Sequence, residues 1–386
     1  MVVERSRFST RIPSYAVRIS ALVINASVPL VAVWAILLGE GAIAVLIVPA
    51  FYLLIVPLVD LAVGDGCLES QGQEEDPAFE FFLYAQIPFH ALIFVGAIVA
   101  AVVADLPFWA KLVGVAGFGL VNGQCALIGH EFAHKPGRRT RFSAQVALSI
   151  VGMGHFLLEH VRGHHIFVAT PEDCASARLG EGIYAFASRD MVGEITGGHA
   201  REAERLRNKG LAVISWQNRI LQSYAMSIAL AGLLIYALGW QALPWIALHH
   251  IAAWFTLSLF TYIEHYGLLR KQLADGRREH VQRVHTWDTD AMISNMLLLN
   301  VQRHSDHHAK PMKPYQSLRV HGPGPRLPTG YFGMIVLALF PPLWRLVMDA
   351  RTVRAVEGDV ARLHILGKPS PRLSRLIECT GSRLAA

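Results

Sequence analysis

Residues 108–142 read FWAKLVGVAGFGLVNGQCALIGHEFAHKPGRRTRF, and this stretch decides the fold. Its apolar part, 108–129, is long enough for a helix that crosses a bilayer, which takes about 20 such residues. His130 and His134 follow at once, and the Pro136–Gly137 pair with its basic neighbours ends the helix where it leaves the lipid. The stretch therefore predicts a membrane helix that carries two histidines at its end.

Other apolar runs of similar length predict an all-α integral membrane protein with about six spanning helices. The six runs are 17–39, 41–63, 83–104, 108–129, 222–240 and 243–264. The composition agrees, because 53% hydrophobic and 17% charged residues are far from the average of soluble domains. A weaker run at 331–348 contains Pro341 and Pro342, and we expect it to be an interfacial or packed segment.

The order of these runs predicts one membrane-embedded unit over residues 1–386. Four spans (17–129) precede a histidine-rich segment (130–221), and two more (222–264) precede a histidine-rich tail (265–386). The positive charge comes mainly from segments outside the membrane: Arg5, Arg11 and Arg18 near the N-terminus, and the basic residues within 135–141, 201–209 and 270–283. Positive charge marks the cytoplasmic side, so we expect both termini and the histidine segments there, as a cap. Nothing resembles a nucleic-acid-binding module.

Histidines gather beside the points where the spans leave the membrane. The pairs His130/His134 and His160/His164 have the i, i+4 spacing that places two side chains on one helix face. Each such pair can bind one metal ion. His165 stands five residues after His160, from where it can reach a second metal ion. A further group, QRHSDHHA at 302–309, has spacings of three and four, and a single histidine ends the sixth span.

These groups supply too many ligands for one metal ion, so we expect two ions. The nine histidines are His130, His134, His160, His164, His165, His265, His304, His307 and His308. Imidazole binds zinc, copper, iron and nickel, so the ligands alone leave the metal open. Two iron ions with four or five ligands each use all nine and keep positions open for O₂, whereas a closed zinc site leaves several unused.

An acidic residue accompanies each group: Glu131, Glu159, Glu264 and Asp306. Neighbours on a helix point about 100° apart, so each carboxylate is expected to orient a histidine of another group. Alternatively, these four carboxylates are ordinary solvated charges at helix ends.

Two other classes of protein share parts of this pattern. His130-Glu131-Phe132-Ala133-His134 matches the HExxH signature of zinc metalloproteases, but such an enzyme leaves the remaining groups without a purpose. A metal transporter places ionisable residues along a path at mid-membrane. Here the only mid-span pair of histidines is His249 and His250, which no acidic residue accompanies, and we interpret the pair as helix packing or tunnel lining.

The motifs resemble those of the membrane-bound alkane monooxygenase family, part of the membrane fatty-acid desaturase and hydroxylase superfamily. The similar stretches are Gly152 to His165, Val168 to Pro171, Tyr262 to Arg270 (YIEHYGLLR), Val301 to Ala309 (VQRHSDHHA) and Leu327 to Tyr331 (LPTGY). The resemblance covers residues from about 15 to 350.

This resemblance implies terminal hydroxylation of medium-chain n-alkanes with O₂ at a non-haem di-iron centre in the bacterial inner membrane. The alkane comes from the membrane lipid, and rubredoxin, reduced by its reductase, supplies electrons. The nine histidines hold the iron, and no protein nucleophile takes part. Xylene monooxygenases and fatty-acid desaturases are related alternatives.

The same comparison places two residues in the substrate tunnel. Tyr52 takes the position of a bulky residue that limits alkane length, and Gln124 that of another chain-length determinant, although its side chain is polar. Packing within the membrane is the alternative for Tyr52.

Overall fold

The structure is a computed structural model, and it describes residues 14–66, 77–320 and 322–384. Arg5 and Arg11, which contribute to the expected orientation, lie outside the described residues. Within the described ranges the protein is helical and has no β-strand, only isolated bridges such as the one between Leu179 and Ile365. The predicted all-α class is confirmed.

Six helical spans are long and apolar enough to cross a membrane, which confirms the predicted number. They are α1 (Ser14–Leu37); η1 (Ala42–Leu46), α2 (Ile47–Ala50), η2 (Phe51–Ile55) and α3 (Val56–Val63), which form the second; α4 (Pro77–Val103); α5 (Phe108–Asn122) and α6 (Gln124–Ala133), which form the fourth; α11 (Arg219–Leu238); and η4 (Trp240–Ala242) with α12 (Leu243–His265). The fourth span ends at Ala133 rather than at 129, because nothing interrupts the helix before Pro136.

Close packing of the fourth span on α12 brings two histidine-bearing helix ends together. A Cβ atom at Gly123 would lie 2.5 Å from Cβ of Thr256, and one at Gly119 would lie 2.5 Å from the carbonyl oxygen of His249. Only glycine permits so short a distance between the two backbones. The helices therefore run side by side to their ends, where His130 and His265 stand.

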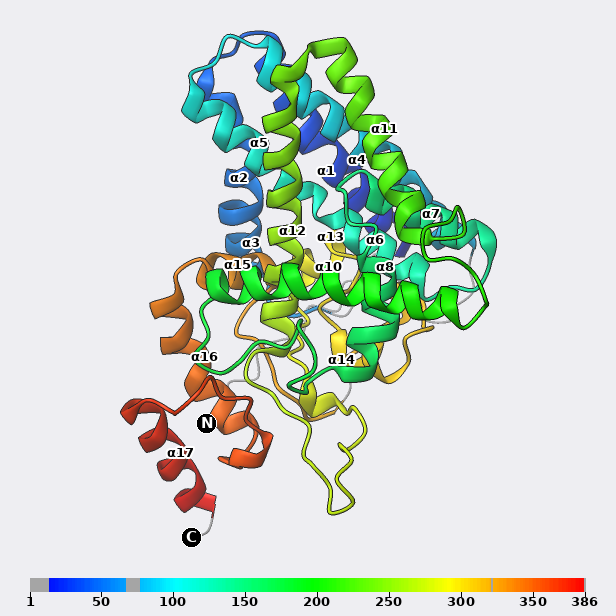
Figure 1. The fold of residues 1–386 in the computed structure, drawn as a ribbon. Coiled ribbons are helices and arrows are strands. Elements are labelled where there is room, and N and C mark those ends of the chain that lie inside the picture. Colours follow the sequence, from blue (N-terminus) through cyan, green and yellow to red (C-terminus); the bar gives the residue numbers. More distant parts are fainter. Residues whose placement is uncertain (1–13, 67–76, 321, 385–386) are drawn as a thin grey trace.

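The remaining elements form a layer at one end of the spanning helices. These are α7 (Arg138–Ser149), α8 (Phe156–Glu159), η3 (His160–His164), α9 (His165–Phe167), α10 (Ile183–Arg207), η5 (Arg283–His285), α13 (Met292–Leu297), α14 (His304–Ala309), η6 (Tyr315–Ser317), α15 (Tyr331–Ala338), α16 (Pro341–Ala355), η7 (Val360–Arg362) and α17 (Pro371–Leu384). Helix α10 runs across the ends of the upright helices, and α8 packs against it (Figure 1).

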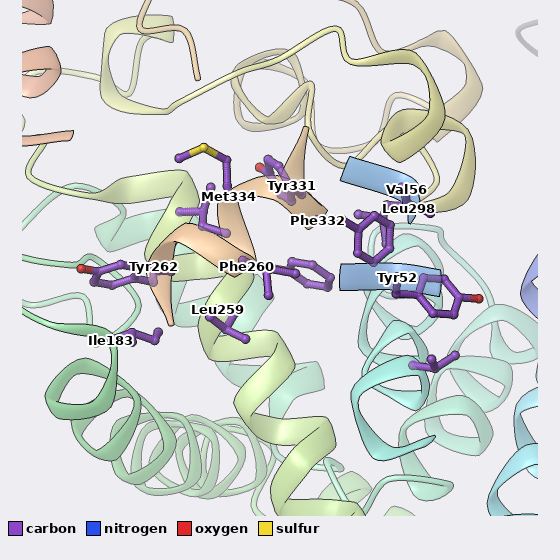
Figure 2. Close-up of a cluster of buried hydrophobic side chains, with 14 of the residues drawn as sticks. Tyr52, Val56, Ile183, Leu259, Phe260, Tyr262, Leu298, Tyr331, Phe332 and Met334 are labelled. Atoms are coloured by element: carbon purple, nitrogen blue, oxygen red, sulfur yellow. The ribbon is translucent and has the colours of Figure 1, made fainter. Parts of the chain in front are cut away.

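The weak apolar run at 331–348 is packed inside this layer as two helices, α15 and α16, which Pro341 and Pro342 separate. Figure 2 shows α15 between the second span and α12, with Phe332 facing Tyr52 and Tyr331 near Phe260. The ring centroids of Tyr52 and Phe332 are 5.3 Å apart. Helix α15 therefore stabilises the second span and α12 by packing between them.

Candidate metal centre

All nine predicted histidines meet in one place and form two groups. The first group holds His130, His134, His160, His165 and His307, and the second holds His164, His265, His304 and His308. Within each group, one ring nitrogen of every member lies within 4.8 Å of the others. Seven of the nine are buried, whereas His134 and His165 are half-buried. The first group is therefore the one nearer to solvent.

The partition of His160, His164 and His165 differs from the prediction. The i, i+4 spacing predicted a shared metal for His160 and His164, but the structure places His160 with His165 and sends His164 to the other group. The cause is local, because residues 160–164 form a π-helical turn, η3, whose wider turn brings i and i+5 onto one face. His130 and His134 do lie in one group, as their i, i+4 spacing predicts, and His304 and His308 share the other group.

Ring nitrogens face one another at short distances in both groups. The Nε2 atoms of His130 and His307 are 2.9 Å apart, as are those of His160 and His165 and those of His304 and His308. Two ligands about 2.1 Å from one metal are about 3.0 Å apart when they subtend a right angle and about 3.4 Å apart in a tetrahedron. The observed distances are short enough for neighbouring rings to share one metal ion, and they do not identify the metal.

The protonation of these rings suits metal binding. Burial lowers the pKa of His160, His304, His307 and His308 well below the usual range, and the neighbouring histidines lower it further. Burial also lowers the pKa of His134, to about 4. At neutral pH these rings are uncharged and offer a lone pair. In addition, the buried Nε2 atom of His265 has no hydrogen-bond partner among the described residues, so the donor set fits a bound cation.

One carboxylate that the sequence did not reveal contacts a histidine of the second group. The Asp173 carboxylate is buried and lies 3.0 Å from Nδ1 of His164, and it also accepts a hydrogen bond from Ser176 Oγ at 2.6 Å. Burial opposes the charge on the His164 ring, but Asp173 raises the pKa of that ring above its usual value. A carboxylate on the outer nitrogen fixes the ring and leaves the other nitrogen for a metal. The Thr170-Pro171-Glu172-Asp173 turn directly after the histidines was the available signal.

The four carboxylates expected near the histidines have different surroundings. Glu264 lies 3.4 Å from Nε2 of His304 and accepts a hydrogen bond from the hydroxyl of Tyr331. Glu131 accepts from the backbone N–H of Tyr315 and faces Lys135, Glu159 pairs with Arg201, and Asp306 pairs with Lys313. Glu264 thus contacts the His304 nitrogen that also faces His308, and not the outer nitrogen of that ring. For all four carboxylates the orienting role stays a prediction.

A narrow hollow adjoins the first group. It is lined by Leu127, His130, Glu131, Leu299, Val301, His307, Tyr315 and Leu318, and it contains about 280 Å³ of empty space, counting the part that is open. Leu127 lies one turn after Gln124 on α6, so the apolar wall and the ligand His130 belong to the same helix. The hollow places an apolar surface directly beside two rings of the first group, His130 and His307.

The two expected tunnel residues belong to one hydrogen-bond network. Asn25 Nδ2 donates to Oε1 of Gln124 at 3.0 Å, and the hydroxyl of Tyr52 donates to Asn25 Oδ1 at 3.2 Å. All three side chains are buried. The polar Gln124 is therefore satisfied within the membrane by Asn25, a residue that the sequence did not connect with it.

A third group of potential ligands lies near α10. Cys174, Asp190 and Glu194 place one donor atom each within 4.8 Å of the others, and Asp190 also accepts a hydrogen bond from Ser258 Oγ at 2.6 Å. Burial raises the pKa of Asp190 to about 7, and burial together with Asp190 raises that of Glu194 well above its usual value. Since two buried carboxylates this close resist double ionisation, we interpret the pair as holding a proton.

We expect Asp190→Asn to make the protein less sensitive to alkaline pH. The pKa of Asp190 is higher in the folded state than its ordinary value of 3.8, so the folded state binds more protons between about pH 4 and 7 and stability falls as pH rises through that window. The variant lacks this dependence. Between pH 6 and 8 its melting temperature should fall less than that of the wild type, by a difference of roughly 2–4 °C. Exposed Asp275→Asn is the control, and equal slopes for Asp190→Asn and wild type contradict the expectation.

Comparisons with known proteins agree with this geometry. Residues 106–323 match the family model described as fatty acid desaturase. The chain is 36% identical to an alkane 1-monooxygenase of Pseudomonas putida over 87% of this chain and 85% of that protein, and 38% identical to an alkane 1-monooxygenase of Ectopseudomonas oleovorans over 76% and 73%. It is 28% identical to the hydroxylase component of a xylene/toluene monooxygenase of Pseudomonas putida over 62% and 70%.

Proposed function

Since the chain belongs to the alkane 1-monooxygenase family, within the fatty acid desaturase superfamily, we propose that it hydroxylates the terminal carbon of medium-chain n-alkanes at two iron ions. It is an oxidoreductase and a multi-pass membrane protein. The observation that carries the proposal is the gathering of nine histidines into two adjacent groups with short distances between ring nitrogens. Rubredoxin is the proposed electron donor, and the bacterial inner membrane the proposed location.

The nine histidines are the proposed ligands, five for one iron and four for the other. When bound, the pair of irons supplies the reduction of O₂ and the oxidation of a strong C–H bond. The residues of the chain do the rest. Asp173 holds the ring of His164 in orientation through Nδ1. No side chain has to act as a nucleophile.

The hollow beside His130 and His307 is the proposed place for the end of the alkane. Leu127, Leu299 and Val301 surround that position with apolar side chains and keep water away. An alkane offers no polar group, so position along the chain is selected by shape alone, and each buried CH₂ contributes about 0.8 kcal/mol.

Electrons are proposed to enter on the side of the first group, where His134 and His165 are half-buried. Arg162 and Lys310 are exposed and lie within two residues of ligating histidines along the chain. Their charge suits an acidic carrier such as rubredoxin. In this proposal the histidine layer and both termini face the cytoplasm, which the basic segments between spans support.

The zinc metalloprotease alternative is less compatible with the geometry. Its two histidines would need one further ligand, but His130 and His134 share their group with three histidines from other elements. Its general base would be Glu131, which is engaged with the backbone of Tyr315 and with Lys135.

The test combines metal analysis and product analysis on one purified sample. The full-length protein is supplied with octane, O₂, rubredoxin and its reductase. About two irons per chain and the appearance of 1-octanol support the proposal. Zinc without any oxygenated product overturns it, an octene as product indicates a desaturase, and preferential oxidation of xylene over octane indicates an aromatic-methyl hydroxylase.

We expect the side chain of Tyr52 to limit alkane length. Replacing it by leucine removes the hydroxyl bonded to Asn25 and shortens the side chain that faces Phe332, so longer alkanes should be accepted (Figure 2). Competition of octane with dodecane and hexadecane, followed by gas chromatography, measures the shift. Tyr52→Phe keeps the ring and loses only the hydroxyl, so it should change the profile little. An unchanged profile in Tyr52→Leu removes this residue from the tunnel.

A further inference from the structure

The loop between α10 and α11, residues 208–218, exposes two large apolar side chains directly before a spanning helix. Ile214 is 89% exposed and Trp216 is 79% exposed. Helix α11 begins at Arg219, and only 17% of its apolar stretch is buried inside the protein, so most of its surface faces lipid. Since α10 belongs to the histidine layer, the loop lies where α11 enters the bilayer from that layer (Figure 1).

Hydrogen bonds to its backbone fix the shape of this loop. Asn218 Nδ2 donates to the carbonyl oxygen of Val213 at 2.9 Å, and Gln222 Nε2 donates to that of Trp216 at 2.6 Å. Asn218 also caps α11 with its side-chain oxygen. Ile214 and Trp216 are therefore held on the outside of an ordered loop. Tryptophan is enriched at the membrane–water boundary, because its ring suits the apolar layer and its N–H suits water.

Positive charge gathers beside this loop and is only partly neutralised. Arg219 is half-buried, and the guanidinium groups of Arg141 on α7 and Arg205 on α10 repel it. Arg205 is paired with Glu202, and the same carboxylate attracts Arg219. Within the part of the chain that the structure describes, Arg141 and Arg219 form no ion pair. One carboxylate therefore serves three guanidinium groups, which leaves an excess of positive charge at this place.

An anionic phospholipid matches the charged and the apolar part of this surface together. Exposed Arg207 and Lys209 add to the three arginines, and basic clusters of this size beside a membrane helix are typical of binding to anionic lipid. A guanidinium group binds phosphate through two parallel hydrogen bonds. An acidic soluble protein matches the charge, but it does not account for two exposed apolar side chains at the edge of the bilayer.

We propose that Arg141 and Arg219 bind the phosphate of an anionic phospholipid from the leaflet next to the histidine layer, and that Ile214 and Trp216 contact its glycerol and upper acyl chain. Each arginine near an anionic membrane surface contributes about a fivefold gain in affinity. The occupant is a lipid that stays in the bilayer, and it is not a substrate. The site is independent of the reaction proposed above, because it uses none of the nine histidines.

The test titrates the full-length protein, purified in mild detergent and freed of lipid, with dioctanoyl phosphatidylglycerol and with zwitterionic dioctanoyl phosphatidylcholine. Native mass spectrometry measures both affinities. We expect phosphatidylglycerol to bind more tightly, by about 10-fold or more. Arg219→Gln and Arg141→Gln should each lower its affinity by about fivefold and the double variant by about 25-fold, whereas Arg219→Lys should lose less. Trp216→Ala should weaken the binding of both lipids alike.

The control is Arg277→Gln, which removes an exposed charge from the 270–283 segment and should change neither affinity. Equal affinities of the wild type for the two lipids would overturn the proposal, because they indicate a lipid contact without recognition of the headgroup. Unchanged affinity for phosphatidylglycerol in the double variant, with a wild-type melting temperature, would overturn it as well, because the lipid then binds elsewhere.

Three further results would replace the lipid by another occupant, and each of them overturns the proposal. If inorganic phosphate competes fully and Trp216→Ala has no effect, the site belongs to a soluble anion. If Trp216→Ala changes the oligomeric state and leaves both lipid affinities unchanged, a second copy of the chain covers this surface. If the double variant loses binding of rubredoxin and keeps that of phosphatidylglycerol, the arginines bind an acidic protein.

Discussion

Replacing His308 by alanine should remove one metal ion and nearly all activity. His308 belongs to the group with four histidines, so the variant leaves three ligands there, and the iron content should fall from about two to about one per chain. Hydroxylation of octane should fall by more than about 100-fold. Loss of a residue that only orients a ligand lowers metal affinity or activity by about 10- to 100-fold, and loss of a direct metal ligand should cost more. Iron analysis and octanol formation on the same purified sample measure both effects.

A matched change in the other group makes this expectation more specific. His134→Ala leaves four histidines in the five-membered group, so it should weaken iron binding less than His308→Ala does. His280 is exposed and belongs to neither group, and His280→Ala should retain full iron and activity. Two irons in His308→Ala, with a melting temperature like that of the wild type, would contradict the assignment of this residue as a ligand.

Asp173→Ala should have the next largest effect, although Asp173 is not expected to touch the metal. Its carboxylate holds Nδ1 of His164, so its loss frees the ring to rotate and lowers its basicity. We expect affinity for iron in the four-histidine group to fall by about 10- to 100-fold. Asp173→Asn retains an oxygen that can accept the hydrogen bond from His164, so its loss should be smaller.

Retention of iron during dialysis against a graded series of chelator concentrations measures this effect. The neighbouring Glu172 is exposed, and Glu172→Gln is the control for a change of charge in the same turn. A merely structural role of Asp173 predicts equal losses for both of its variants, together with lower melting temperatures. Unchanged iron retention in Asp173→Ala would show that His164 needs no partner.

The sequence predicted the features that depend on composition and on contacts along one helix. Six spans follow from apolar length, and the nine histidines follow from their grouping at the ends of spans. The helical spacing rule also assigned His130 with His134 correctly. It was wrong for His160 and His164 because nothing in the letters HVRGHH distinguishes a π-helical turn from an α-helical one.

Contacts between segments that are far apart in the chain could not be predicted from the sequence. Asn25 and Gln124 are 99 residues apart, so their hydrogen bond could not be inferred from spacing. Arg18 was counted as a cytoplasmic charge because it stands at the start of a span, but packing of α1 against Tyr315 and Phe79 buries it. In both cases tertiary structure determines the role of a residue whose local sequence suggests an ordinary one.

The course of α6, the second helix of the fourth span, has a consequence for how two incompatible reactants meet. One helix carries Gln124 and Leu127 at the depth of the hydrocarbon and His130 and His134 at its end. An oily substrate and a water-soluble reductant therefore never have to share a solvent, because each can approach the same few ångströms of helix from its own phase. Under the proposed function, the protein is then a fixed meeting point for the two reactants where the membrane ends.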